Sequence, residues 1–293
     1  MIRELLRRNQ AWVMLRRAQK EGFAHAFQRW KLWRRILRTA PVRTDSEGET
    51  EVRLMCYFFD YLCAIWSLKS FYRAAEVRYP LTIHIQGRAQ ARVAQTLRRH
   101  FPDARIVAQG EADVRVEREL VRQGWKRLLD ARRANQYMQK LTDTVLLSNA
   151  QHIILLDADV LFFRKPAELI EFQGEHLFQQ DQASTYVVEQ AAGITVAPRL
   201  NAGIMRFQRL SISLARCDEY LAEFPDYRGW LEQTLLALHA SEFGTANLLP
   251  ATYLISLDHG IDPETLVARH YAGSSRPLMS EEGMTWLIRH GFL

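Results

Sequence analysis

Two aspartates at the end of an apolar run are spaced to hold one metal ion together. The run Ile153-Ile154-Leu155-Leu156 is followed directly by Asp157-Ala158-Asp159. Side chains two positions apart on an extended segment point to the same side, so both carboxylates can face one ligand. Carboxylate oxygens suit Mg²⁺ or Mn²⁺, which complete their coordination with waters and substrate phosphates. The pattern predicts a metal site for a diphosphate, although an acidic residue at a strand end can also cap the next helix.

Two later segments add groups that could bind a metal, a diphosphate and a sugar. His270-Tyr271-Ala272-Gly273-Ser274-Ser275-Arg276-Pro277 combines an imidazole, a cation and a glycine that lets main-chain N–H groups approach phosphate oxygens. Asn201-Ala202-Gly203 offers an amide with donors and acceptors for sugar hydroxyls. The alternatives are an ordinary surface or core histidine and a turn, in which Asn and Gly are common.

Two segments expected on helices complete the set of candidate residues. Glu232-Gln233 lies at the start of an expected helix, where an acidic residue also stabilises the helix dipole. Lys140 lies in the stretch 124–147, whose apolar residues recur at helical spacing. A solvated side chain is the alternative for Lys140. An acid, an amide and a cation are groups that a phosphorylated sugar could contact.

In order and chemistry, these segments resemble the retaining nucleotide-sugar glycosyltransferases of family 8, which include glycogenin and bacterial lipopolysaccharide galactosyl- and glucosyltransferases. The resemblance covers roughly residues 52–278. The segment at His270 is similar to the family's His-x-x-Gly-x-x-Lys-Pro-Trp, with Arg276 in place of the Lys and Leu278 where the family has Trp. The roles that the resemblance implies are metal ligation by Asp157, Asp159 and His270, donor diphosphate and sugar binding by Lys140, Ala158, Asn201, Ala202, Gly203, Gly273 and Arg276, and catalysis by Gln233 and Glu232.

The resemblance implies an enzyme that uses Mn²⁺ or Mg²⁺ to move a hexose from a UDP-sugar to a hydroxyl acceptor with retention of anomeric configuration. The acceptor would be a saccharide, a lipid-linked molecule or a protein. Gln233 would lie on the face of the anomeric carbon where a nucleophile or ion-stabilising dipole is wanted, and Glu232, in place of an Asp, would contact substrate hydroxyls. Two alternatives stay open. One is a nucleotidyltransferase acting on sugar phosphates, which usually needs a glycine-rich loop that residues 55–61 lack, and the other is a non-catalytic nucleotide-sugar-binding domain.

Alternating strand and helix patterns predict the elements that position these residues. The expected strands are 52–59, 81–85, 105–107 and the run that delivers Asp157, and the expected helices are 61–73, 89–100 and a long one around 120–147. Beyond Asp159, short strands are expected at 177–180, 186–188, 193–197 and 204–207. This alternation predicts an α/β fold, a single Rossmann-like domain with a mixed, mostly parallel central sheet, and the resemblance implies that it is of the GT-A type.

The basic residues are concentrated at the N-terminus. Residues 1–40 contain 11 Lys or Arg and two acidic residues, a net charge of +9, so the remaining 253 residues carry −3 of the +6 total. We expect a basic helical arm over 1–43, a polar linker over 44–51 and the catalytic domain over 52–293. Helices are expected from Arg3 to Lys20 and from Gly22 to Arg38, the second with an apolar stripe formed by Phe23, Phe27, Trp30, Trp33 and Leu37.

Such a stripe can cover the chain's own domain, dock a partner or contact an anionic membrane. Nucleic acid is not an expected partner, because aromatic and basic residues are segregated rather than interleaved. No apolar run approaches the length of a membrane-spanning helix, and the N-terminus lacks the apolar core of a secretory signal. We therefore expect a cytoplasmic protein, with peripheral contact at the inner face of the membrane as an option. Cys56, Cys63 and Cys217 are expected to be buried thiols.

Overall fold

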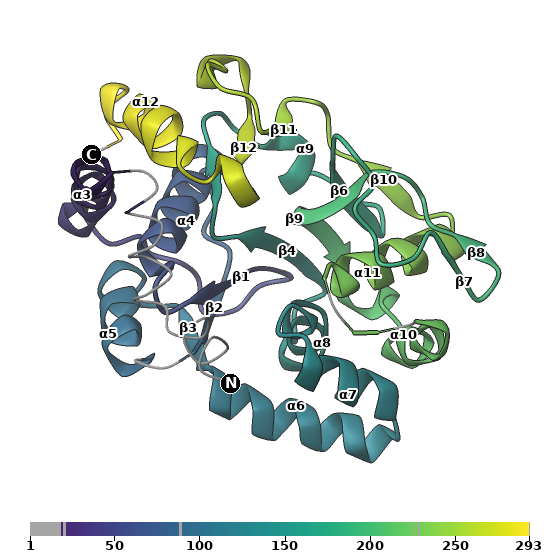
Figure 1. The fold of residues 1–293 in the computed structure, drawn as a ribbon. Coiled ribbons are helices and arrows are strands. Elements are labelled where there is room, and N and C mark those ends of the chain that lie inside the picture. The colour runs from purple at the N-terminus through teal and green to yellow at the C-terminus, as the bar shows by residue number, and fades with distance from the viewer. Residues whose placement is uncertain (1–18, 20–21, 88–89, 225, 228, 293) are drawn as a thin grey trace.

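A seven-stranded sheet forms the centre of the computed structural model, which describes residues 19, 22–87, 90–224, 226–227 and 229–292 (Figure 1). Its strands are β1 (Thr50–Tyr57), β2 (Leu81–Gln86), β3 (Arg105–Ala108), β4 (His152–Asp157), β6 (His176–Gln180), β9 (Leu200–Gln208) and β10 (Ala246–Leu248). The strand order is β10-β6-β9-β4-β1-β2-β3. The pairs within β4-β1-β2-β3 are parallel, as is β10-β6, whereas β9 is antiparallel to both of its neighbours. The predicted mixed, mostly parallel sheet is confirmed.

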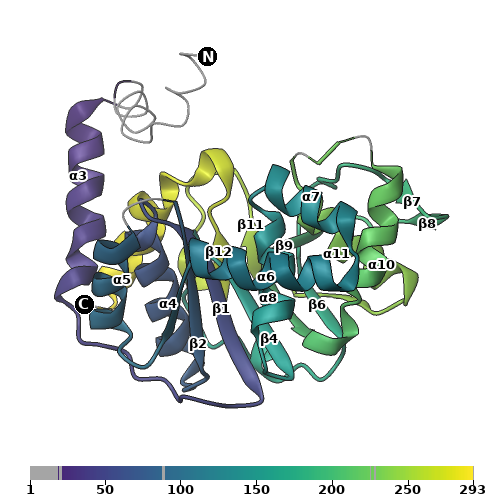
Figure 2. The same ribbon diagram turned by 90° about the horizontal axis from the view of Figure 1, so that it is seen from below.

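Helices cover both faces of this sheet (Figures 1 and 2). One face is covered by α4 (Tyr61–Ala75) and α5 (Gln90–His100), and the other by α6 (Gln109–Gln123), α7 (Lys126–Ala134), α8 (Met138–Leu147), α10 (Leu214–Tyr220) and α11 (Leu231–Glu242). Alternate residues of β4 enter different cores: Ile154 and Leu156 pack with α4, and Ile153 and Leu155 pack with α8 and α11. Burial on both faces explains why this strand is a continuous apolar run instead of an alternating one.

A second, three-stranded sheet joins the middle of the chain to its C-terminal part. It consists of β5 (Val160–Phe162), β11 (Tyr253–Ile255) and β12 (Ala268–His270), in the order β11-β12-β5. β12 runs antiparallel to β5, with His270 opposite Val160. The other elements described beyond β5 are α9 (Ala167–Ile170), β7 (Gln190–Ala191), β8 (Ile194–Thr195), the short helical turns η2 (Arg209–Ser211), η3 (Leu221–Glu223), η4 (Pro263–Thr265) and η5 (Gly273–Ser275), the π-helix η6 (Met279–Met284) and α12 (Thr285–Arg289).

The single long helix expected around 120–147 is wrong, because the segment forms the three helices α6, α7 and α8. The first break follows Gly124, which ends α6 in the left-handed conformation at φ 76°. The second break lies at Asn135, which has an extended backbone and accepts a hydrogen bond on its side chain from the Tyr137 N–H. A local side-chain hydrogen bond of this kind competes with helix formation.

The expected strand at 186–188 is also wrong. The Val187 N–H donates to the Thr234 hydroxyl on α11, at 3.0 Å, instead of to another strand. The strand expected at 193–197 is reduced to β8, and the one expected at 204–207 extends over the nine residues of β9. β1 begins at Thr50, two residues before the expected start. The short strands β5, β7, β10, β11 and β12 were not expected.

The described part of the arm packs beside α4. It comprises α3 (Phe23–Arg34) and the turn η1 (Arg35–Arg38). Ile36 is fully buried in the core that α4 shares, and the Trp66 indole N–H donates to the Trp33 carbonyl at 3.0 Å. The helix expected from Arg3 to Lys20 falls outside the described residues, and the division into arm, linker and domain stays a prediction. Among the residues described here, no helix is both long and apolar enough to cross a bilayer.

Candidate active site

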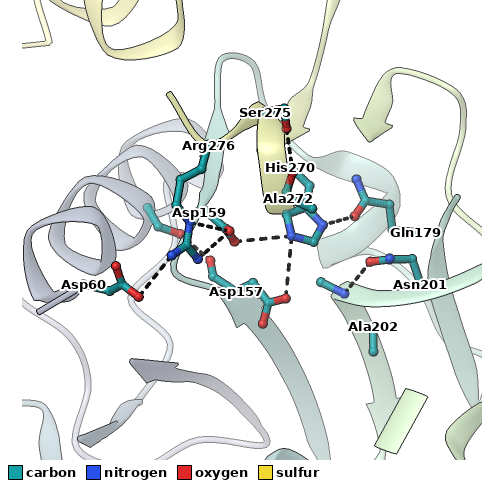
Figure 3. Close-up of polar contacts among 12 residues, drawn as sticks. Asp60, Asp157, Asp159, Gln179, Asn201, Ala202, His270, Ala272, Ser275 and Arg276 are labelled. Carbon is teal, nitrogen blue, oxygen red and sulfur yellow. Dashed lines mark hydrogen bonds and ion pairs between the residues drawn. The ribbon is translucent and has the colours of Figure 1, made fainter. Parts of the chain in front are cut away.

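Three predicted metal ligands meet where β4 and β12 end (Figure 3). Asp157 is the last residue of β4, Asp159 precedes β5, and His270 is the last residue of β12. His270 Nε2 lies 3.6 Å from Asp157 Oδ2 and 3.3 Å from Asp159 Oδ1. One potential ligand atom from each of the three residues lies within 4.8 Å of the ligand atoms of the other two residues. Two carboxylate oxygens and one imidazole nitrogen form a donor set that fits Mn²⁺ and also accommodates Mg²⁺.

β12 is positioned by its pairing with β5, which starts directly after the two aspartates. The Tyr271 N–H donates to the Asp159 carbonyl at 2.8 Å, so the backbone beyond His270 is tied to the Asp-x-Asp turn itself. On the other side, the Ser67 hydroxyl of α4 donates to the Asp157 carbonyl at 3.1 Å. The main chain around the carboxylates is therefore held from both directions.

Two cations face the aspartates from opposite sides. Lys140 Nζ on α8 lies 2.7 Å from Asp157 Oδ1, and an Arg276 guanidinium nitrogen lies 2.7 Å from Asp159 Oδ2. Another guanidinium nitrogen of Arg276 lies 3.2 Å from Asp60 Oδ2. Lys140 is buried, so the alternative of a solvated lysine, which the sequence left open, does not apply.

The pKa values of these groups follow from the balance between burial and charge. Burial alone would lower the pKa of Lys140, but the Asp157 and Glu232 carboxylates outweigh it and raise that pKa. Burial would raise the pKa of Asp159, but Arg276 and His270 outweigh it and lower that pKa. Lys140 is thus a fixed cation and Asp159 a fixed anion, so the site has charges of both signs in place.

A glutamine and a glycine surround the imidazole of His270. The Gln179 carbonyl oxygen Oε1 lies 3.1 Å from His270 Nδ1, and the Gln179 amide nitrogen donates to the Tyr253 carbonyl at 3.1 Å. Gly203 lies against the ring, because a Cβ at that position would overlap the Cε1 and Nδ1 atoms of His270. Gly203 therefore has a steric role that the sequence did not indicate.

Asn201, Ala202 and Gly203 lie within β9 and do not form the turn that was the alternative. The Asn201 Oδ1 accepts a hydrogen bond from the Gly203 N–H at 2.8 Å, and its Nδ2 donates to Asp181 at 3.0 Å. The Ala202 carbonyl accepts a hydrogen bond from Lys140 at 3.2 Å. This strand thus borders the same site as the metal ligands.

Glu232 and Gln233 are buried in the first turn of α11. The Gln233 side chain is held at both ends, because Oε1 accepts from the Ala202 N–H at 3.2 Å and Nε2 donates to the Thr185 carbonyl at 3.0 Å. Glu232 differs, since its Oε2 has no hydrogen-bond partner among the described residues. Burial, opposed by the positive charge of Lys140, raises the pKa of Glu232. A buried oxygen without a partner is suited to receive a substrate hydroxyl.

All of these segments except Gln179 border one cavity of about 910 Å³. It opens beyond the carboxyl ends of β1 and β4, where open α/β sheets bind ligands. Its lining residues include the predicted Lys140, Asp157, Ala158, Asp159, Asn201, Gly203, Glu232, Gln233, His270, Gly273 and Arg276. Ala202 does not line the cavity and contributes through its backbone.

No protein-family model and no curated protein matches the sequence. Solved structures do match the fold. The galactosyltransferase LgtC, solved in complex with donor and acceptor sugar analogs, aligns with a TM-score of 0.50 and 15% identity over 82% of this chain and 95% of its own. Mouse xyloside xylosyltransferase 1 aligns with a TM-score of 0.50 and 15% identity, over 78% and 99%. The bifunctional glycosyltransferase WbbM aligns with a TM-score of 0.51 and 10% identity, over 85% and 52%.

The chain has a GT-A fold. At identities of 10–15%, these alignments establish the architecture and leave the activity to be argued from the site. In this GT-A fold the cavity occupies the edge of the sheet to which the parallel strands β1 and β4 deliver their last residues.

Several residues that line the cavity or contact its side chains were given no individual role from the sequence, although the resemblance implied that the nucleotide base lies near residues 57–60. The turn after β1 supplies Asp60, and its neighbours Tyr57 and Phe59 have stacked rings with centroids 5.3 Å apart. The position after a parallel strand is a signal that could have selected Asp60. Gln179 had no comparable signal, because it lies inside β6 and meets His270 only through the fold.

Proposed function

We propose that the chain is a metal-dependent glycosyltransferase that moves a hexose from a UDP-sugar to a hydroxyl acceptor. The observation that carries this proposal is the meeting of Asp157, Asp159 and His270 with Lys140 and Arg276 at the edge of one large cavity. The GT-A fold, shared with glycosyltransferases, supports it. A nucleotidyltransferase and a non-catalytic nucleotide-sugar-binding domain are not favoured by these observations.

Asp157, Asp159 and His270 would hold Mn²⁺ or Mg²⁺. When bound, the ion supplies Lewis-acid stabilisation of the negative charge that develops on a departing nucleoside diphosphate. Lys140 and Arg276 contribute fixed positive charge for the same phosphates, in a pocket where charges interact more strongly than in water. Gly273, at φ 56°, lines the cavity, and its small size and backbone bend would let main-chain N–H groups approach the phosphates.

The sugar would lie between the metal ligands and the start of α11. Glu232 would accept a hydrogen bond from a sugar or acceptor hydroxyl through its unpartnered oxygen. Gln233, held in one orientation by the Ala202 N–H and the Thr185 carbonyl, would support the anomeric carbon from the face opposite the diphosphate. Attack by the acceptor oxygen from the face that the diphosphate leaves would retain the anomeric configuration, as in family 8. The role of Gln233 and the retention of configuration are both parts of this proposal.

The acceptor class stays open between saccharides, lipid-linked molecules and proteins. A cytoplasmic location, with peripheral membrane contact through residues 1–40, also stays a prediction.

The cavity of about 910 Å³ is large enough for a nucleotide-sugar, since small-molecule sites usually measure about 300–1,000 Å³.

The test is metal-dependent release of UDP from UDP-sugars. Purified protein is incubated with UDP-glucose, UDP-galactose and related donors, with Mn²⁺ or with a chelator. We expect slow UDP release without acceptor, dependent on the metal, and a fall of about 100-fold or more for Asp159→Asn because a metal ligand is lost. Asp130→Asn changes an exposed aspartate outside the cavity and serves as the matched control.

Each competing class has its own result. Pyrophosphate chemistry with a nucleoside triphosphate and a sugar phosphate would identify a nucleotidyltransferase. Binding of UDP-sugars without any product would identify a non-catalytic domain. Catalysis by Asp159→Asn within about tenfold of wild type would contradict the proposed metal site.

A further inference from the structure

A row of aromatic side chains on α3 points to solvent. Phe23, Phe27 and Trp30 are 60%, 51% and 42% exposed. Their spacing of four and then three residues places them on one face of the helix. The Phe27 and Trp30 rings stack, with centroids 5.8 Å apart. Exposed aromatic residues in one row form a contiguous apolar surface, which usually marks a contact with another body.

The rest of the predicted stripe has a different environment. Trp33 and Leu37 are half-buried against the core, and Ile36 is fully buried in it. The arm therefore contacts its own domain through the end of α3 and through the turn η1. That contact leaves the row formed by Phe23, Phe27 and Trp30 uncovered by the described residues.

Cations border this aromatic row. Lys31 Nζ lies 4.8 Å from the centroid of the Phe27 ring, and the Arg34 guanidinium lies 4.7 Å from that of Trp30. Residues 22–38 contain five Lys or Arg and no Asp or Glu. A helix with exposed aromatic rings and only positive charges matches the surface of an anionic bilayer, where rings enter the interface and cations meet headgroups.

We propose that the face of α3 formed by Phe23, Phe27, Trp30, Lys31 and Arg34 docks on an anionic lipid surface. A symmetric contact between two copies of this face would bring Lys31 and Arg34 of one copy close to the same cations of the other, which disfavours a second copy as the occupant. Figure 2 shows the Phe23 end of α3 extending beyond α4 and α5, on the side of the molecule to which the parallel strands run. The Phe23 end of α3 thus lies toward the side on which the cavity opens.

Vesicle co-sedimentation tests the docking and requires no enzymatic activity. The full chain is mixed with phosphatidylcholine vesicles that contain or lack phosphatidylserine. We expect binding only with phosphatidylserine, and a loss of about tenfold or more for Phe27→Ser combined with Trp30→Ser, because both anchoring rings are removed. Phe243→Ser combined with Leu257→Ser is the matched control, since these side chains are 56% and 58% exposed elsewhere on the surface.

Charge reversal by Lys31→Glu and Arg34→Glu separates the electrostatic contribution, and it should remove the preference for phosphatidylserine. Equal binding to both vesicle types, or wild-type binding by the Phe27→Ser/Trp30→Ser variant, overturns the proposal. Concentration-dependent dimers that this variant abolishes, measured by light scattering, also overturn it, because the face would then join two copies. UDP release measured without vesicles should be the same for every variant, so failure of docking is distinguishable from failure of the proposed activity.

A second inference concerns how His270 is oriented. The Gln179 amide nitrogen is committed to the Tyr253 carbonyl, so its Oε1 is the atom that faces His270 Nδ1. A carbonyl oxygen can only accept, so Nδ1 must carry the proton and donate it. When the ring is neutral, as a metal ligand must be, Nε2, which faces both aspartates, is then the nitrogen whose lone pair can bind the metal. We infer that Gln179 is a positioning residue that presents Nε2 of His270 to the metal.

This inference rests on the metal site of the proposed function. Gln179 is fully buried and lies outside the cavity lining, so it would touch neither substrate nor metal. Partners of this kind around a ligating histidine typically change metal affinity by about 10- to 100-fold when removed.

Isothermal titration with Mn²⁺ tests it without a turnover assay. Gln179→Met keeps the length of the side chain and removes the acceptor, so we expect Mn²⁺ affinity to fall by about 10- to 100-fold. Gln179→Glu keeps an acceptor toward Nδ1, so we expect it to restore most of that affinity. Gln86→Met is the matched control, because Gln86 lines the same cavity and bonds to Gln139 and the Gln136 carbonyl instead of to a metal ligand.

Wild-type affinity in a folded Gln179→Met protein would overturn the inference. If Gln179→Met does not fold, Gln179→Glu is the variant that tests the inference. A loss of Mn²⁺ affinity in Gln179→Glu would then also overturn the inference. If the wild-type protein binds no Mn²⁺, the proposed metal site itself fails, which is a separate result.

Discussion

Gly203 shows how one small residue can be required by a side chain far away in the sequence. Any Cβ at this position would overlap the Cε1 and Nδ1 atoms of His270, and Nδ1 also faces Gln179. In Gly203→Ala the ring must therefore leave its present place beside Asp157 and Asp159. We expect Mn²⁺ affinity to fall by at least about tenfold, because the third ligand is displaced, as measured by isothermal titration.

Gly110→Ala on α6 is the control for this change. A Cβ at Gly110 has no atom within 4 Å, so metal affinity should stay at the wild-type value. Unchanged Mn²⁺ binding in Gly203→Ala would mean that the ring of His270 can move without cost, and that its place beside the aspartates does not depend on the glycine.

At the level of residues, the sequence could predict what is local. Asp157 and Asp159 were expected on one extended segment, but only Asp157 lies in β4, whereas Asp159 lies in the turn before β5, and this tight turn keeps both carboxylates on one site. His270 was linked to them only by the family resemblance, since 110 residues separate it from the end of that turn and no periodicity spans such a distance. Gln179, inside an ordinary strand pattern, could not be distinguished from a structural glutamine until the fold placed it against the imidazole.

At the level of elements, β6 contains a histidine whose burial makes the stability of the fold depend on pH. His176 is fully buried, Nδ1 lies 2.6 Å from the Thr245 hydroxyl and Nε2 lies 3.0 Å from the Ser211 hydroxyl. Burial, together with the nearby His239, lowers the pKa of His176 to about 4. The folded state therefore disfavours the protonated ring, while the unfolded chain accepts a proton near the ordinary value of about 6.5.

Because the folded pKa is below the unfolded one, this contribution to stability is fully present above about pH 6.5 and is lost as the pH falls toward 4. At pH 5 the loss amounts to about 2 kcal/mol relative to pH 7. In His176→Gln, which cannot titrate, we expect the free energy of unfolding to fall by about 2 kcal/mol less over the same interval. Denaturant titrations at both pH values measure the difference.

His259→Gln is the control, because it makes the same replacement at an exposed histidine outside the core. A His176→Gln protein with the same pH dependence as wild type would show that protonation of this ring is not resisted by the fold.

The elements that the sequence predicted well are those with strong, long patterns. α4, α5 and β2 were expected within two residues of their bounds, because their apolar periodicity and end signals agree. The helix expected around 120–147 was wrong because Gly124 and Asn135 interrupt an apolar spacing that otherwise continues. The three-residue strands β5, β11 and β12 are too short to produce a period, and they exist because they pair with one another.

At the level of the whole molecule, alternation of strands and helices was sufficient to predict a mostly parallel sheet covered on both faces. It was not sufficient to predict the strand order. β9 lies between β4 and β6 and runs antiparallel to both, which brings Asn201 and Gly203 beside the candidate metal ligands. Strand order depends on pairings between distant segments, and apolar periodicity within each segment does not record its neighbours.

The pairing of β12 with β5 also has a consequence for how the protein is made. His270 joins the two aspartates only through this pairing, and every strand of the seven-stranded sheet precedes it in the chain. On the ribosome, all seven strands are therefore synthesised while the candidate metal site still lacks its imidazole. A product that terminates before β12 would carry the complete set of central strands and the Asp-x-Asp turn, yet it would lack the third candidate ligand, so this site can be completed only after β12 has been made.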